Sequence, residues 1–259
     1  MLDRVAEIVR RHDPDRFLTA LFAPGQKRPH LFTLYAFNHE LARAREAVSE
    51  AYLALIRLQW WREVAEGAKR AHEVAAPLAE ALDSGALDRA DLLAMIDARE
   101  IEAEPFIASL DAWREYLLNA AGGVMVAAGR LLGAPNPEAL RPLGAAYGVG
   151  GVLRSVEALA RQKRCLLPAA VLRAHDLTPE RVIAEPSSEK VATVRLELAQ
   201  EGRALLLQGD RIRLPGDAVA AALPAVLAGR DLERPTEPAQ PRGLMDRLAV
   251  IWAGITRRI

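Results

Sequence analysis

Hydrophobic residues recur at intervals of three and four along most of the chain, which is the spacing of an amphipathic α-helix. Leu34, Phe37, Leu41 and Ala44 form one such stripe, and Tyr52 begins a second. Alternating runs of β-branched residues, which would indicate strands, are almost absent. The pattern therefore predicts an all-α protein.

Glycine and proline interrupt this pattern and divide it into separate elements. Asp13 precedes Pro14, so we expect Asp13 to cap the helix that begins there. Ser49 is expected to cap the helix that follows it. Further helices are predicted over 72–83, 88–102, 107–120, 121–133, 137–160, 167–175, 178–183, 187–208 and 216–229.

The character of the chain changes near its C-terminus. Residues 230–243 combine prolines and charges without an apolar period, which predicts an exposed linker. Residues 244–259 then predict a final amphipathic helix, with Leu248 and Ile251 on its apolar side. No internal repeat is visible, so residues 1–229 are expected to form a single helical domain.

Composition narrows the function classes. The 259 residues are 51% hydrophobic, enough to bury a substantial core. Lys plus Arg and Asp plus Glu both number 34, so no overall field attracts nucleic acid, which is excluded as an expected partner. The single cysteine, Cys165, excludes an internal disulfide and a cysteine metal cluster.

The start "MLDRVAEIVRRHDPDR" lacks the apolar region of a secretory signal. No later segment approaches the roughly 18 uncharged apolar residues of a membrane span. We therefore expect a soluble, intracellular protein.

The segment "YGVGGVLRSVEALARQKRCLLP" joins small residues to charged ones. The glycines at 148, 150 and 151 predict the close approach of another helix. Charged residues then share one face of the helix: Arg154, Glu157 and Arg161. They form either a solvated stripe of ion pairs or part of a site, and the pattern leaves both open.

Several stretches between residues 13 and 180 carry a further similarity. In order they are "DRFLTALFAPGQKRPHLFTLYAFNHELA", "IRLQWWRE", "IDAREIE", "AWREYLLNAAGGVMVAAGRLLGA" and "YGVGGVLRSVEALARQKRCLLPAAVLRAHDLT". Together they resemble the landmarks of the squalene/phytoene synthase family. The wording "YAFNHELARAREAVSE" followed by "RLQWWRE" is most similar to the branch typified by a mitochondrial complex I assembly factor.

The resemblance implies an isoprenoid (terpenoid) synthase fold, in which two acidic motifs face each other across a central cavity. In such enzymes the acids hold magnesium and a prenyl diphosphate, and the metal neutralises the departing diphosphate. Here the acidic positions of the first motif fall on Ala42, Arg43 and Glu46. In the second motif Arg154 matches the family's arginine, but the acidic positions fall on Ser155 and Leu159.

The first motif keeps one carboxylate, and Glu157 is displaced from the acidic position of the second. Together they do not reproduce two opposed metal-binding clusters. Asp91 and Asp97 are the nearest substitutes, but they belong to another helix and have the wrong spacing. We therefore expect no magnesium and no prenyl transfer. If the chain is active, Glu46 and Glu157 are the expected metal ligands.

Arginines can also bind an anion without metal. The candidates are Arg43, Arg154, Arg161, Lys163 and Arg164. The alternative is salt bridging with Glu40, Glu46 and Glu157, since buried charges are usually paired. In the family fold Arg43 and Glu46 would then join the charged face of the second helix in one mixed cluster.

The histidines and tryptophans favour packing over chemistry. His30 and His39 lack partners at ligand spacing, which indicates polar packing. Trp60, Trp61 and Trp113 lie among apolar neighbours and are expected in the core.

Three functions follow from the resemblance and the lost acids. The first is a non-catalytic factor that assists respiratory complex I assembly, bound to complex I subunits or intermediates. The second is an active condensing enzyme of the squalene, hydroxysqualene or phytoene synthase type, and the third is a carrier of a prenyl or lipid ligand. The expected location is the bacterial cytoplasm or the mitochondrial matrix, with weak contact of the last helix with the inner membrane.

Overall fold

The computed structural model describes residues 2–46, 50–209, 212–237 and 240–258, and every regular element in these ranges is helical. The prediction of an all-α protein is confirmed. The α-helices are α1 Leu2–His12, α2 Pro14–Ala20, α3 Arg28–Glu46, α4 Ala51–Glu66, α5 Ala75–Asp83, α6 Arg89–Asp97, α7 Leu110–Asn119, α8 Ala121–Leu132, α9 Arg141–Arg154, α10 Val156–Arg161, α11 Ala169–Ala174, α12 Pro179–Ala184, α13 Glu189–Gly209, α14 Val219–Ala222, α15 Pro224–Glu233 and α16 Leu244–Thr256. Short 3-10 helices are η1 Glu100–Ala103, η2 Pro137–Leu140 and η3 Gly216–Ala218.

The helix boundaries follow the predicted punctuation, with several interruptions that the pattern missed. The helix predicted over 88–102 ends at Asp97 and is followed by the separate 3-10 helix η1. Asp13 caps α2, because its side chain accepts a hydrogen bond from the backbone N–H of Arg16. The predicted helix over 137–160 breaks at Ser155, which separates α9 from α10. Pro224 begins α15 and so divides the helix predicted over 216–229, since proline cannot continue the backbone ladder. The predicted cap Ser49 lies outside the described residues.

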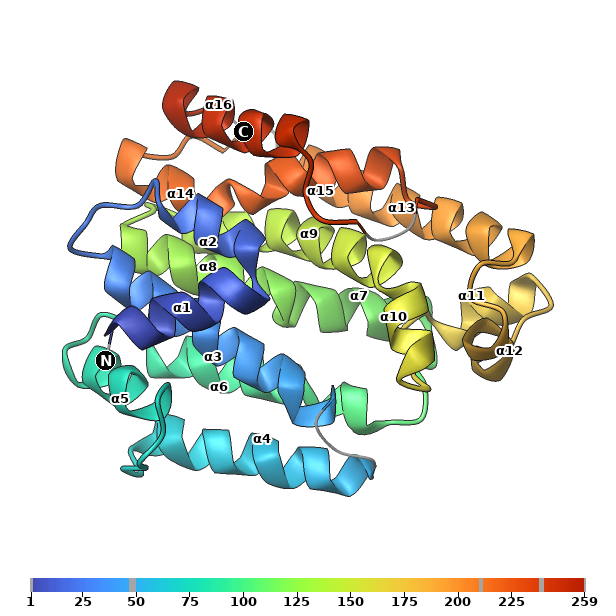
Figure 1. Cartoon of the computed structure of the whole chain (residues 1–259), viewed down its shortest axis with the longest axis horizontal. Coiled ribbons are helices and arrows are strands. Elements are labelled where there is room, and N and C mark those ends of the chain that lie inside the picture. The colour runs from blue at the N-terminus through green and yellow to red at the C-terminus, as the bar shows by residue number, and fades with distance from the viewer. Residues whose placement is uncertain (1, 47–49, 210–211, 238–239, 259) are drawn as a thin grey trace.

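Helix α9 runs through the middle of the molecule and packs against α7, α8, α13 and α15 (Figure 1). Glycines make this packing close. A Cβ atom on Gly148 would lie 2.7 Å from the Cβ of Ala121, and one on Gly150 would lie 3.1 Å from the Cβ of Asp231. Gly151 differs, because nothing lies within 4 Å of its added Cβ, and it borders a cavity instead.

The expected linker is in part a structured segment. Helix α15 continues through Glu233, so the first residues of 230–243 are helical. Near its other end, the side chain of Arg242 is only 10% exposed and is bound by two aspartates. The prediction of an exposed linker is therefore wrong at Arg242, because distant carboxylates draw its guanidinium inward.

Helix α16 follows this segment and packs against α15 at the upper edge of the molecule in Figure 1. Val250 and Ala253 are buried, while the opposite face leaves large apolar side chains exposed. Within the described residues, no helix is both long enough and apolar enough to span a membrane.

Candidate functional site

A cavity of about 510 Å³ lies among the turn between α1 and α2, α3, η1, α7 and the α9–α10 junction. Both segments that resemble the family's acidic motifs border it. Ala42 and Glu46 come from α3, and Ser155 and Leu159 come from the α9–α10 junction. Among these four side chains only Glu46 is a carboxylate, so the motif positions carry a single acid at the cavity.

The remaining motif residues point to other partners. Arg43 Nη1 donates to Glu40 Oε1 of its own helix at 3.2 Å. Arg154 Nη2 donates to the carbonyl of Gln240 at 2.8 Å, and its Nη1 lies 3.5 Å from an oxygen of Asp231. Neither arginine borders the central cavity.

The predicted mixed cluster between the two motif helices is wrong. Glu157 accepts a hydrogen bond from Ser187 Oγ at 3.1 Å, and Arg161 is exposed. Glu157 therefore faces the turn between α12 and α13, where Ser187 lies.

The predicted anion-binding residues are therefore dispersed. Arg161 and Lys163 lie at the surface, and only Arg164 of the five candidates borders the cavity. Arg164 is buried, and its Nη2 donates to Glu102 Oε2 at 2.7 Å. The anion-binding role of this set remains a prediction.

Glu102 of η1 is the centre of a buried polar cluster. Its Oε1 accepts hydrogen bonds from Arg99 Nη1 at 2.6 Å and from the Tyr116 hydroxyl at 2.8 Å. Arg99 Nη2 also donates to Asn38 Oδ1 at 3.2 Å. With Arg164 on the other oxygen, one carboxylate pairs with two guanidinium groups and offsets only one of their charges, so this cluster keeps an excess positive charge.

Burial alone would raise the pKa of Glu102, but Arg99 and Arg164 together with their hydrogen bonds lower it below the ordinary value. Burial raises the pKa of Tyr116, and the neighbouring Glu102 raises it further. Glu102 is therefore ionised and Tyr116 protonated at neutral pH. The cluster is fixed as a network of ionic hydrogen bonds.

A second polar cluster occupies the other side of the cavity. Arg16 is buried, and its Nη1 donates to Asp13 Oδ2 at 2.8 Å. The guanidinium carbon lies 5.6 Å from the ring centroid of Tyr35 and 4.9 Å from that of Tyr147, within cation–π range. Burial lowers the pKa of Arg16, yet the opposing effect of Asp13 leaves it raised, so the charge is retained.

The histidines and tryptophans occupy largely the expected environments. His39 stacks on His12 with ring centroids 4.4 Å apart, and it borders the cavity. Burial lowers the pKa of His39, and His12 lowers it further. Trp61 and Trp113 are buried in the core as predicted, and Trp60 packs partly buried against Trp61.

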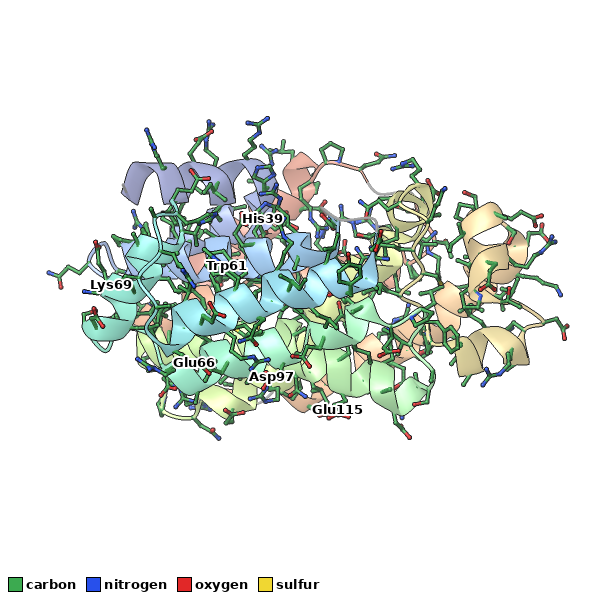
Figure 2. All side chains as sticks on the ribbon, turned by 90° about the horizontal axis from the view of Figure 1, so that it is seen from below. His39, Trp61, Glu66, Lys69, Asp97 and Glu115 are labelled. Carbon is green, nitrogen blue, oxygen red and sulfur yellow. The ribbon has the colours of Figure 1, made fainter. Side chains whose placement is uncertain are left out.

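These residues do not fit the magnesium site of the prenyl-transferring members of this fold. Among the described residues the cavity's carboxylates are Asp13, Glu46 and Glu102, and guanidinium groups already bind the first and last. No group of three or more His, Cys, Asp or Glu side chains in the described ranges is arranged to hold a metal ion. Asp97 lies well away from the cavity residue His39 in Figure 2 and pairs with Arg62 at 2.6 Å.

The pattern alone did not identify the residues that dominate this site. Arg99 and Glu102 lie in "IDAREIE" and Tyr116 in "AWREYLLNAAGG". These stretches resemble the family but lie outside its two acidic motifs. Arg99 and Glu102 lie among other charged residues, so no signal in the sequence indicated that these two side chains are buried. Their partnership was not visible, because 62 residues separate Glu102 from Arg164.

Known proteins that are similar to this chain identify its family. Residues 9–240 match the family model for squalene/phytoene synthase. A human relative named NADH dehydrogenase (ubiquinone) complex I, assembly factor 6 is 25% identical over 203 residues, which cover 75% of this chain and 61% of that protein. The mouse protein of the same name is 25% identical over 230 residues, covering 85% of this chain and 69% of its own length. The chain thus spans about three fifths of the human relative.

Solved structures share the fold at low sequence identity. The squalene synthase HpnC of Alicyclobacillus acidocaldarius has a TM-score of 0.74 and 17% identity, covering 92% of this chain and 95% of that one. A dehydrosqualene synthase has a TM-score of 0.81 and 14% identity, covering 99% of this chain and 95% of that one. These similarities establish the isoprenoid synthase fold. Because the family model matches most of its length, this chain belongs to the squalene/phytoene synthase family.

Proposed function

We propose that this chain is a non-catalytic member of its family that assists the assembly of respiratory complex I. The observation that carries the proposal is the chemistry of the cavity wall. Ala42, Ser155 and Leu159 occupy positions that, by resemblance to the family, would carry metal-binding acids. Relatives named as complex I assembly factors support the same role.

The polar clusters fit a protein whose cavity is stabilised internally instead of by a metal. A prenyl-transferring enzyme leaves its carboxylates free to bind Mg²⁺, whereas Asp13 and Glu102 are held by arginines. The protein therefore needs no magnesium to keep its structure. Its partners are complex I subunits or assembly intermediates.

We further propose that the protein works at the inner membrane, on the cytoplasmic side in a bacterium or on the matrix side in a mitochondrion. Helix α16 supports this location, because Leu244, Met245, Trp252 and Ile255 are each more than two thirds exposed. Arginines flank this apolar face, as in helices that lie on anionic bilayers: Arg247, Arg257 and Arg258.

The deciding experiment deletes the gene in its own host and measures complex I content on native gels together with NADH oxidation by membranes. We expect both to fall and to return when the wild-type gene is restored. The variant Glu46→Gln should restore them equally well, because assembly does not use the cavity's motif carboxylate. Normal complex I in the deletion strain would refute the proposal.

A separate assay tests the enzymatic alternative on the purified protein. Farnesyl or geranylgeranyl diphosphate is incubated with the protein and Mg²⁺, and the extract is searched for squalene, hydroxysqualene or phytoene. We expect none of them. Formation of product by the wild type, and its loss in Glu46→Gln, would return the chain to the active enzymes.

A further inference from the structure

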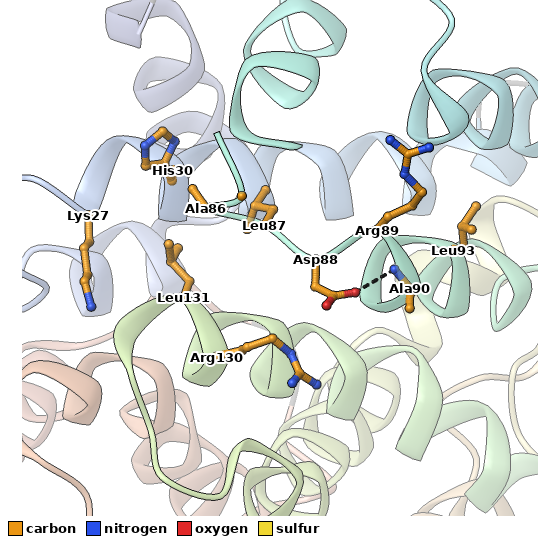
Figure 3. A pocket seen from close by; sticks show the side chains of 11 residues that line it. Lys27, His30, Ala86, Leu87, Asp88, Arg89, Ala90, Leu93, Arg130 and Leu131 are labelled. Carbon is orange, nitrogen blue, oxygen red and sulfur yellow. Dashed lines mark hydrogen bonds between the residues drawn. The ribbon is translucent and has the colours of Figure 1, made fainter. Parts of the chain in front are cut away.

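A second hollow, of about 750 Å³, lies between the start of α3, the turn before α6 and the end of α8 (Figure 3). We call it the cationic groove. Its rim and floor are defined by Lys27, Arg89, Arg130, Leu87, Leu93 and Leu131. Among the described residues it shares no lining side chain with the central cavity.

Positive charge on this rim is only partly compensated. Lys27 forms no ion pair with a described residue. Arg89 Nη1 donates to the backbone carbonyl of Glu66 at 3.0 Å, which leaves its charge without a carboxylate. Arg130 is paired with Asp91 at 2.8 Å and lies 3.7 Å from Glu138.

The groove also contains one carboxylate, Asp88, whose charge offsets part of the positive charge of the rim. Asp88 caps α6, with Oδ1 accepting hydrogen bonds from the N–H groups of Ala90 and Asp91. His30 also borders the groove. The groove therefore presents a cationic rim to an approaching partner.

The arrangement of these cations indicates the shape of the ligand. In Figure 3 Lys27 and Arg89 lie at opposite ends of the groove, with Leu87 and Leu131 between them. Separated cations do not converge on one phosphate, but they match acidic side chains spaced along a chain. One helical turn, with a diameter of roughly 11 Å and a pitch of about 5.4 Å, occupies roughly 500 Å³, which the groove can hold.

We propose that the cationic groove docks an acidic amphipathic segment of a partner protein. Leucines of that segment would pack on Leu87, Leu93 and Leu131, and its carboxylates would face Lys27 and Arg89. Nucleic acid is disfavoured, because His30 is the only aromatic ring among the described lining residues on which bases could stack. A bilayer surface is disfavoured because the site is concave.

The test uses fluorescence anisotropy with the full-length protein and a short synthetic peptide in which glutamates flank leucines at helical spacing. Two probes serve as comparisons: the same peptide with lysine in place of glutamate, and a single-stranded oligonucleotide of equal negative charge. The acidic peptide should bind saturably and lose affinity as salt rises. The lysine peptide and the oligonucleotide should bind more weakly.

The double variant Lys27→Glu/Arg89→Glu should weaken acidic peptide binding by about tenfold or more. The matched control Arg173→Glu/Arg247→Glu makes the same charge change on exposed residues of α11 and α16, and it should bind like the wild type. Thermal unfolding monitors whether each variant is folded. A milder pair, Lys27→Gln/Arg89→Gln, covers the case in which charge reversal disturbs folding.

Three outcomes would overturn the proposal: no saturable binding of the acidic peptide, equal or tighter binding of either comparison probe, or full affinity in both groove variants. None of these measurements involves complex I. Failure of the groove proposal therefore leaves the assembly role to be judged by the deletion strain, and the reverse also holds.

Discussion

Glu102 is the residue whose loss should cost the most stability in the site. It is 7% exposed and pairs with both Arg99 and Arg164, which are also largely buried. Glu102→Gln leaves two guanidinium groups without a carboxylate, and breaking a buried ion pair in this way costs about 3 kcal/mol or more. Urea unfolding followed by circular dichroism measures the change.

Glu157→Gln is the matched control for Glu102→Gln. Glu157 is only partly buried and its recorded hydrogen bond comes from Ser187 at an exposed position, so we expect a loss of at most about 0.5 kcal/mol. An equal effect of the two substitutions would show that the Glu102 cluster is not a principal stabilising network.

Glu102 should also make the free energy of unfolding depend on pH. The pKa of Glu102 is lower in the folded protein than its ordinary value of 4.5, because arginines outweigh burial. Its contribution is fully present above pH 4.5 and is lost as pH falls through the folded-state pKa. Stability measured across acidic pH should thus converge for wild type and Glu102→Gln, and a constant difference would contradict this assignment.

At the scale of elements, Arg242 fastens the C-terminal segment to the helical bundle. It donates from both Nη atoms to Asp231 of α15 at 2.5 and 2.8 Å, and from Nε to Asp15 of α2 at 2.9 Å. Arg242→Met leaves Asp15 without an ion pair and leaves Asp231 with only the longer contact from Arg154. It should therefore lower the free energy of unfolding by about 3 kcal/mol. Amide exchange should also quicken across α16.

Arg247→Met is the control for Arg242→Met, since Arg247 is exposed on α16. It should leave both stability and exchange nearly unchanged. If Arg242→Met behaved like Arg247→Met, the segment would be held by the packing of Val250 and Ala253 instead.

Helix α16 is expected to contact the membrane surface. Trp252 and Ile255 are 71% and 68% exposed, so replacing both with serine should scarcely affect folding. We expect the wild type to sediment with vesicles of phosphatidylglycerol and phosphatidylethanolamine, and the Trp252→Ser/Ile255→Ser variant to bind about tenfold less. High salt should release the protein.

Tyr52→Ser provides the comparison for α16. Tyr52 is 56% exposed on α4, which lies on the opposite side of the molecule from α16 in Figure 1. Its substitution should not change vesicle binding. Equal binding by the wild type and the α16 variant would exclude this helix as the membrane contact.

For the molecule as a whole, the cavity chemistry predicts indifference to magnesium. An ion that binds only the folded state raises its stability in proportion to occupancy, and the carboxylates bound to arginine are not free to hold one. The melting temperature should be the same in Mg²⁺ and in EDTA. A rise that depends on Mg²⁺ concentration would show that a metal site persists and would favour the enzymatic alternative.

The family and the helical class were predictable because their signals are local. Periodic hydrophobic positions predict helices wherever they occur, and Pro14 with Asp13 marks a helix start within a few residues. The predicted exchange of acids for Ala42, Ser155 and Leu159 likewise rests on the motifs alone. Each of these inferences needs only neighbouring residues.

The partnerships of charged side chains were decided by the tertiary structure. The resemblance to the family fold predicted one cluster of Arg43, Glu46, Arg154, Glu157 and Arg161. In the structure Arg43, Arg154 and Glu157 have other partners. The break at Ser155 changes the direction of the following turn, and no hydrophobic period records it.

The sequence by itself determined the helical class and the family, and it predicted the loss of the motif acids. Only the tertiary structure decided that Glu102 binds Arg164 across 62 residues and that Arg242 reaches Asp15 across 227. The physical reason is one of range. Helix formation depends on residues three or four apart, whereas an ion pair between distant helices depends on how every intervening helix packs.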